Sequence, residues 1–452
     1  MDIRWWILIW LCATAFVTEF FSQETSLLVQ RFTGTAEACH DGSDSCLNLD
    51  IMDFSTVISV YSWAAAVGAL VSGIVIDRYG NKVSLWLVAA SFFLGPLLYT
   101  LGTYTSSTSG AMALLTLGRI ISGLSGGANS VISNRIKARW FFYKELGLSF
   151  AAAILFDRLG SACAFVILGA LLPVLKMRGV MWLAFGMTSL GALFILIISY
   201  LDNRKVDESH DHGENLSWIA VKTPGTLWSV VRTLDGVFWS ISVIVFLYYG
   251  TVAVFTANGP NFLAQSYGFS ESKSSYIIGL VYIVGLVTPV VGHLLDRYGY
   301  REYWMIGMAL VLFLSLFLFC IVPKFPAVPL VLLIGLGFSI IGSLVWTSFT
   351  LVVAPENVGF ALGFGKFFHY TGTGTTTAIA GAILNNAASM LKLPWLVFFV
   401  FSTAMAAVCV VISFIIVLLN RKTGYRLTLS QLKRSQRTPA QEVTPLISAA
   451  TE

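Results

Sequence analysis

The sequence has few charged residues for a chain of 452. Charged residues make up 11% of it and hydrophobic residues 56%, whereas a soluble domain averages about 25% charged residues. So few charges cannot cover a water-facing surface, which excludes an ordinary soluble domain. The net charge is only +5, and most basic residues lie in short loops, so we predict no nucleic-acid partner.

Motifs for nucleotide and metal chemistry are also missing. The sequence contains no phosphate-binding Gly-x-x-x-x-Gly-Lys loop, no Gly-rich dinucleotide loop, no His-Glu-x-x-His pair and no paired-cysteine zinc spacing. We therefore predict no cofactor, no metal site and no enzymatic activity. Without a nucleotide site, active transport driven by ATP is disfavoured.

Long apolar segments dominate what is present. About 20 apolar residues are needed to span roughly 30 Å of hydrocarbon, and the sequence contains twelve segments of that kind. We therefore predict an all-α integral membrane protein in contact with membrane lipid. The predicted segments are 5–29, 53–77, 83–103, 110–136, 146–174, 179–201, 234–263, 272–295, 302–322, 327–354, 357–386 and 393–419.

A polar stretch in the middle of the chain divides these segments into two groups of six. We predict two pseudo-symmetric six-helix bundles joined by a cytosolic central loop and followed by a polar, disordered tail. The first bundle is expected at 1–202, the loop at 203–233, the second bundle at 234–420 and the tail at 421–452.

One short motif occurs twice. Residues 73–80 read Gly-Ile-Val-Ile-Asp-Arg-Tyr-Gly, and residues 292–299, which lie 219 positions later, read Gly-His-Leu-Leu-Asp-Arg-Tyr-Gly. Recurrence at nearly half the chain length indicates an internal duplication. Two homologous halves of membrane helices are the usual construction of a secondary transporter, with the substrate site between them.

Each copy of the motif lies where an apolar segment ends, at the membrane surface. There a glycine lets two helices approach closely, and an aspartate can cap or pair with a neighbouring helix terminus. The motif is therefore either a latch between helices or a simple interface anchor, and its presence in both halves favours the latch. The predicted gating residues are Gly73, Asp77, Arg78, Gly292, Asp296 and Arg297.

The distribution of Lys and Arg predicts the orientation. Of the 28 such residues, 19 fall on the side of the N-terminus, the repeated motif, the central loop and the tail, and six fall in the opposite loops. Positive residues accumulate in the cytosol, so both termini are expected there. The first segment begins at Ile3 with no cleavage-type sequence after it, so we interpret it as a retained helix.

Arg158 is the sharpest binding candidate. It lies about 13 residues into its segment, roughly 20 Å deep at about 1.5 Å per residue, close to the middle of the membrane. The planar guanidinium of an arginine binds both oxygens of a carboxylate. Asp157 points about 100° away around the helix, where it could bind an amine. The alternative for Arg158 is a buried ion pair with Glu19 or Glu24.

Arg119 also lies inside a predicted segment. Together with small and hydroxyl residues it forms one helix stripe that is expected to face protein rather than lipid. A charge inside the membrane is costly and suggests a function. For Arg119 a substrate contact and a structural contact with neighbouring carbonyls remain equally open.

A polar face in the second half completes the predicted substrate site. Lys366 and His369 are three residues apart and share one face of the eleventh segment, where a cavity would need polar groups. The alternative is that they are packing polar residues. Tyr61 and Tyr249 are further candidates for the cavity lining, although aromatic residues are common in such segments.

Two of the six cysteines are candidates for a disulfide. Cys39 and Cys46 lie in one loop on the predicted non-cytosolic side, where the compartment can oxidise them. The alternative is a pair of free thiols, because one nearby histidine is too few for a metal site. The only Asn-x-Ser/Thr sequence begins at Asn215 on the predicted cytosolic side, so no glycan is expected on the opposite face.

The repeated motif and the Gly118-Arg119 pair, followed by Gly123, Gly126 and Gly127, resemble the major facilitator superfamily. Within it, several stretches resemble the lysosomal dipeptide transporter family of animals, the most specific from Trp140 to Ser161. The resemblance implies export of dipeptides, preferentially cationic ones, from lysosome to cytosol by uniport and alternating access. It also implies a homodimer and a glycosylated single-span accessory subunit. The matching stretches begin at Tyr61, Trp140, Arg158, Tyr200, Gly268 and Val353.

The sequence departs from that family at two places. Arg158 matches the family's midplane arginine, whose role is similar to that of a clamp for the peptide carboxylate. Gly127, however, stands where the family is expected to carry a glutamate. Asp157, Glu19 or Glu24 would have to replace it. The family's sorting signal lies at the N-terminus, whereas this tail carries a Glu-x-x-x-Leu-Ile form that clathrin adaptors bind. Its residues are Glu442, Leu446 and Ile447.

Three functions therefore compete. The leading prediction is a lysosomal dipeptide uniporter. A second is an organic-anion or drug carrier of the same superfamily, which would use Arg158 and Lys366 for an anionic substrate. A non-transporting membrane receptor or scaffold is the third, and the interior charges argue against it, because a scaffold gains nothing by burying them.

Overall fold

The computed structural model describes most of the chain as helices. Within the described residues the elements are helices and the turns between them, as the apolar segments predict. The predicted sorting signal at 442–447 lies outside the described residues, and so do the side chains of Asp77 and Asp296. The described residues are 3–40, 42, 44–141, 146–211, 232, 234–322, 325–353, 358–390, 394–422, 424 and 427–428.

The first half of the chain contains six membrane spans. The long helices α4 and α7 each hold two segments separated by non-helical backbone, at Gly80 in α4 and at Lys176 in α7. The π-helix η1 joins α6 to α7. The elements are α1 (Ile3–Leu27), α2 (Val29–Phe32), α3 (Glu37–His40), α4 (Ile51–Gly102), α5 (Thr108–Phe141), α6 (Leu146–Cys163), η1 (Ala164–Leu168) and α7 (Gly169–Asp211).

The second half repeats this arrangement with its own six spans. Short π and 3₁₀ segments, η3 and η4, interrupt two of the spans. The elements are α9 (Gly236–Ile244), η3 (Val245–Tyr249), α10 (Gly250–Tyr267), α11 (Glu271–Ile283), η4 (Val284–Val287), α12 (Thr288–Tyr298), α13 (Arg301–Ile321), α14 (Ala327–Val352), α15 (Val358–Met390) and α16 (Pro394–Lys422).

The number of spans agrees with the twelve predicted segments. Ten stretches among the described residues are long and apolar enough to cross a membrane, and one of them, Leu148–Asp202, is 55 residues long and holds two spans. α15, the helix that carries Lys366 and His369, supplies the remaining one, at 357–386 of the prediction. The chain is a multi-pass membrane protein.

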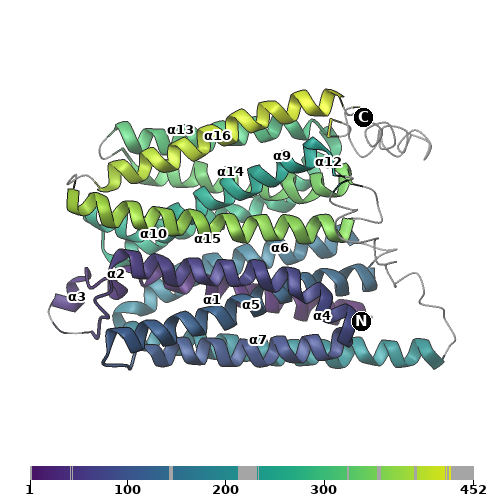
Figure 1. Ribbon diagram of the computed structural model, residues 1–452, viewed down its shortest axis with the longest axis horizontal. Helices are drawn as coiled ribbons and strands as arrows, with labels where there is room; N and C mark the ends of the chain where they lie inside the picture. The colour runs from purple at the N-terminus through teal and green to yellow at the C-terminus, as the bar shows by residue number, and fades with distance from the viewer. Residues whose placement is uncertain are drawn as a thin grey trace.

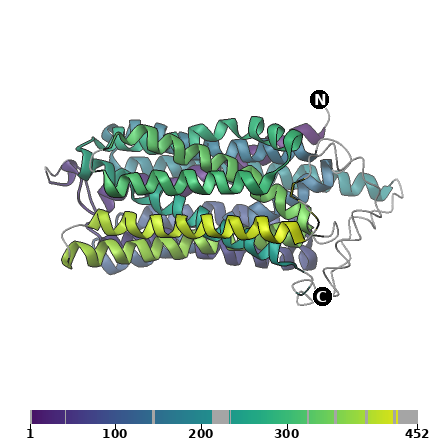
Figure 2. The same ribbon diagram turned by 90° about the horizontal axis from the view of Figure 1, so that it is seen from above.

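The helices run side by side along the long axis of the molecule (Figures 1 and 2). α2 and α3 lie at one end, here called the α3 end, whereas α1 begins and α16 ends at the opposite end. The two halves meet where α4 contacts α15, α6 contacts α11, and α1 contacts α10. This boundary between the halves is the place where a solute site would be expected.

The internal duplication is visible in the backbone. Gly80 and Gly299, the last residues of the two motif copies, have φ angles of 78° and 73°. Residues other than glycine rarely adopt this left-handed conformation, so each motif ends in the residue that its turn requires. Each turn leads directly from one span to the next, in the first half within α4 and in the second from α12 to α13.

Gly127 packs α5 directly against α4. A Cβ at this position would lie 2.0 Å from the carbonyl oxygen of Ala65, so no larger side chain fits. Gly127 therefore allows α5 and α4 to pack closely. The glutamate that the family resemblance implies at this position would not fit.

Candidate functional site

Arg158 of α6 reaches across the boundary between the halves. Its guanidinium carbon lies 3.8 Å from the ring centroid of Phe338 in α14, and it forms a hydrogen bond with the hydroxyl of Tyr249 in η3. Its Nε has no hydrogen-bond partner among the described residues. The predicted carboxylate-binding side chain thus lies between the two halves with donor capacity left unused.

Glycines make room for this side chain. A Cβ at Gly285 of η4 would lie 2.9 Å from the Cγ of Arg158, and one at Gly342 of α14 would lie 3.2 Å from its Nη2. A Cβ at Gly160 would lie 2.2 Å from the carbonyl oxygen of Phe16, so α6 packs tightly against α1. Close packing on one side and glycines on the other fix where Arg158 emerges.

The second half contributes a connected group of aromatic and basic residues. The ring centroids of Tyr249 and His369 lie 4.2 Å apart, and Trp346 Nε1 donates to the hydroxyl of Tyr249 at 3.2 Å. The Nζ of Lys366 lies 4.8 Å from the Trp346 ring centroid. The structure therefore brings the predicted residues Lys366, His369 and Tyr249 together with Arg158.

Two carboxylates face these cations from the first half. Glu19 of α1 interacts electrostatically with Asp157, Arg158 and Lys366, and its Oε2 accepts a hydrogen bond from Ser22 Oγ at 3.2 Å. Asp157 interacts with Lys366 and Arg158 as well. The boundary between the halves therefore holds both acidic and basic groups, which suits a solute that carries both charges.

Lys137 belongs to this electrostatic group, although no sequence pattern singles it out. It is only 4% exposed and interacts with Asp157 and Lys366, while its Nζ lies 4.6 Å from the Phe150 ring centroid. The predicted segment ended at 136, whereas α5 continues to Phe141. Because the helix continues for another turn, Lys137 is buried and does not lie in a loop.

Arg119 lies inside the first half instead of beside Arg158. It is 1% exposed, and its guanidinium carbon lies 4.3 Å from the ring centroid of Tyr99, 4.8 Å from that of Phe21 and 5.4 Å from that of Tyr61. Its Nη2 donates to the Tyr99 hydroxyl at 3.3 Å. Of the two interpretations, this placement fits the structural contact, made here with aromatic rings instead of carbonyls.

The two motif copies have similar surroundings. Arg78 and Arg297 are exposed, and each stacks on the tyrosine that follows it, with distances of 5.6 and 5.7 Å to the ring centroids. A Cβ at Gly73 or Gly292 would meet no atom of the described chain within 4 Å. Contrary to the expectation, neither glycine mediates a close helix contact in this conformation.

Cys39 and Cys46 form a disulfide in the loop between α1 and α4. The remaining cysteines, Cys12, Cys163, Cys320 and Cys409, are free. Among the described residues there is no group of three His, Cys, Asp or Glu side chains that could hold a metal ion.

Curated proteins are similar in sequence to this chain over most of its length. The lysosomal dipeptide transporter MFSD1 of Homo sapiens is 25% identical over 407 residues, which cover 86% of this chain and 83% of that protein. The MFSD1 of Danio rerio is 24% identical over 386 residues, covering 82% and 80%. The sequence resemblance to this family is thereby confirmed.

Solved structures show the same architecture at lower identity. The crystal structure of a D-xylose-proton symporter has a TM-score of 0.68 at 15% identity and covers 90% of this chain and 97% of that one. A POT family transporter in complex with 5-aminolevulinic acid has a TM-score of 0.64 at 16% identity, covering 92% and 96%. A family model described as Major Facilitator Superfamily matches residues 7–375, so the chain belongs to that superfamily and is a secondary transporter.

Proposed function

We propose that this transporter is a dipeptide uniporter of the lysosomal membrane, which exports dipeptides from the lumen to the cytosol by alternating access. The names of the relatives supply the substrate class and the compartment. The predicted orientation, with both termini in the cytosol, would direct the α3 end to the lumen.

The observation that carries the proposal is the mixture of charges at the boundary between the halves. A dipeptide bears a carboxylate and an ammonium group, and the site offers Arg158 with an unpaired Nε together with Glu19 and Asp157. We assign the carboxylate to Arg158, because a guanidinium binds it in bidentate fashion. Lys366, His369 and Tyr249 of the second half lie beside Arg158.

The amine contact is assigned to Glu19 and Asp157. Gly127 cannot be replaced by the glutamate that the family resemblance implies, because α4 occupies that space. Two carboxylates beside the site leave one for the peptide ammonium and one for a basic side chain. This arrangement supports the preference for cationic dipeptides.

The remaining predicted features belong to the same proposal. The Asp-Arg motifs, Asp77-Arg78 and Asp296-Arg297, act as cytosolic latches between the bundles 1–202 and 234–420. The transporter forms a homodimer and binds a glycosylated single-span accessory subunit, which would shield an α3 end that has no glycan of its own. An adaptor bound to the tail, 421–452, directs the protein to lysosomes.

Uptake into proteoliposomes tests the proposal. We expect purified protein to accelerate the flux of a labelled cationic dipeptide such as Lys-Ala down its gradient, with equal rates with and without an imposed pH gradient. Dipeptides with an acetylated N-terminus or an amidated C-terminus should fail to compete, because each removes one of the two charges. Competition by simple organic anions but not by dipeptides would instead identify an organic-anion carrier.

A further inference from the structure

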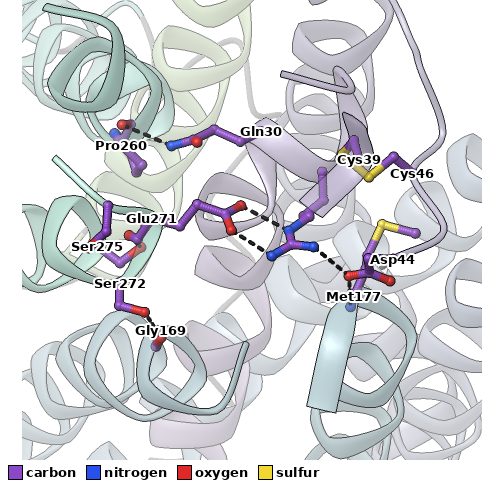
Figure 3. Close-up of polar contacts among 12 residues, drawn as sticks. Gln30, Cys39, Asp44, Cys46, Gly169, Met177, Pro260, Glu271, Ser272 and Ser275 are labelled. Carbon is purple, nitrogen blue, oxygen red and sulfur yellow. Dashed lines mark hydrogen bonds and ion pairs between the residues drawn. A yellow bond between two sulfur atoms is a disulfide. The ribbon is translucent and has the colours of Figure 1, made fainter. Parts of the chain in front are cut away.

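At the α3 end, one arginine binds two carboxylates that belong to different halves (Figure 3). Arg31, in α2, is 4% exposed. Its Nη1 donates to Asp44 Oδ2 at 2.8 Å, whereas its Nε and Nη2 donate to the two carboxylate oxygens of Glu271 at 2.9 and 2.6 Å. Asp44 lies in the first half, and Glu271 begins α11 in the second. A single guanidinium thus ties the halves together.

Two further hydrogen bonds cross the boundary beside it. Gln30 Nε2 donates to the carbonyl oxygen of Pro260 at 3.3 Å, and Ser272 Oγ donates to that of Gly169 at 2.7 Å (Figure 3). Both are neutral, and hydrogen bonds between charged groups are roughly twice as strong as neutral ones. The bidentate pair of Arg31 with Glu271 is therefore the strongest of these three contacts.

Arg31 is fixed from its own side by the disulfide loop. Asp44 lies between Cys39 and Cys46, whose bond closes the loop. The same Oδ2 of Asp44 that binds Arg31 also accepts a hydrogen bond from the backbone N–H of Met177 at 2.8 Å. The Asp44 side chain is only 2% exposed. The backbone of Met177 in α7 holds it through the hydrogen bond, and the Cys39–Cys46 disulfide restrains the loop that carries it.

We propose that the Arg31–Glu271 pair is the gate that holds the α3 end closed, and that the disulfide loop positions Arg31 for it through Asp44. When the halves separate, Glu271 moves away with α11, whereas Asp44 stays on the guanidinium because both belong to the first half. Arg31 thus keeps a counter-charge in both states, and no buried charge is left unpaired. The inference rests on the proposed function only in that opening of this end admits the solute.

Distances between spin labels in the purified protein test the gate without any substrate. Labels are introduced as a non-canonical amino acid at exposed Ser106 in the first half and exposed Val328 in the second, so that the disulfide and the free cysteines stay unmodified. We expect Glu271→Gln to raise the ratio of open to closed molecules on the order of tenfold. Glu37→Gln, which neutralises an exposed carboxylate of α3, is the matched control and should leave the ratio unchanged. An unchanged distance distribution in Glu271→Gln overturns the gate.

The positioning role is tested by non-additivity. Replacing both Cys39 and Cys46 by Ser should open this end partly. Asp44→Asn should have the same effect with the disulfide intact, and it serves as the test if the variant without the disulfide does not fold. When either change is combined with Glu271→Gln, the ratio of open to closed molecules should equal that of Glu271→Gln alone, because all these changes act through the Arg31–Glu271 ion pair. Additive effects would show that the loop only stabilises the fold and would overturn its role in the gate.

Dipeptide flux measured on the same variants separates the two proposals. Absent dipeptide transport with an intact gate response would remove the proposed substrate and leave the gate in place. Normal dipeptide transport with unchanged label distances in Glu271→Gln would remove the gate and leave the substrate in place.

Discussion

At the scale of single residues, Arg158 shows how a half-buried charge can be held for a ligand. An unpaired charge inside a protein is costly, and here the Phe338 ring covers one face of the guanidinium at 3.8 Å, while the Tyr249 hydroxyl takes one hydrogen bond. The Nε remains without a partner among the described residues. A substrate carboxylate would supply the missing acceptor.

We predict that Arg158→Ala abolishes the thermal stabilisation that dipeptides confer, while the protein still expresses and folds. Loss of a charged hydrogen bond costs about 1.5–3 kcal/mol, enough to remove weak binding. Arg158→Lys should restore little, because a point charge cannot reproduce the planar fork. The measurement is the shift in melting temperature with and without Lys-Ala, and Lys82→Ala, at an exposed position, is the control. A normal shift in Arg158→Ala would show that the carboxylate binds elsewhere.

The sequence indicated most of the polar residues that the structure brings together around Arg158, but not Lys137. Lys366 and His369 were recognised because a polar residue within an apolar segment costs free energy to bury in the membrane and therefore suggests a function. Depth along its segment favoured Arg158 over Arg119, whose substrate and structural interpretations remained equally open. Only tertiary packing shows that Arg119 faces aromatic rings within the first half. Lys137 was missed because hydropathy marks the membrane core, and a helix can continue beyond it.

At the scale of elements, the local sequence predicted a turn where the backbone conformation requires a glycine. Gly80 and Gly299 end the repeated motifs with positive φ angles, as a turn that reverses the chain between two spans requires. Contacts between distant segments gave no such signal. Arg31 and Glu271 are 240 residues apart, and nothing in either local sequence indicates the other.

The latch prediction belongs to the same scale. Asp77→Asn or Asp296→Asn should weaken the contact between helices at the end opposite to the α3 end. We expect the rate at which a cysteine introduced at Ser133 is labelled from the cytosolic side to rise several-fold. That position lies one turn after Ser130, whose hydroxyl bonds Tyr370 across the halves. Asp53→Asn, at the other end of α4, is the control. Equal labelling in both motif variants and the control would reduce the motifs to membrane-interface anchors.

At the scale of the whole molecule, the two halves are joined at the α3 end by Arg31 and at mid-depth by the residues around Arg158. Trp63 of α4 adds a contact there, donating from Nε1 to Thr375 Oγ1 of α15 at 3.2 Å. Transport by alternating access requires that such contacts break and reform as the halves rock. The amino-acid pattern predicted the two halves through their repeated motif, but the conformation they adopt depends on long-range pairs that a single sequence does not reveal.

The destination of the whole molecule is the last prediction. Replacing Leu446 and Ile447 by Ala should move the protein from acidic organelles to the cell surface. The carbonyl oxygen of Thr428 accepts a hydrogen bond from the backbone N–H of Tyr300 at the start of α13, and Glu442 lies 14 residues after Thr428. A flexible chain of that length reaches roughly 20 Å on average, enough for a bound adaptor to clear the bilayer. Glu442→Gln should cause a smaller shift, because the apolar pair supplies most of the contact, and Thr451→Ala beyond the signal is the control. Microscopy against a lysosomal marker measures the outcome. Lysosomal staining that persists in the double variant would mean that an accessory subunit or another signal sorts the protein.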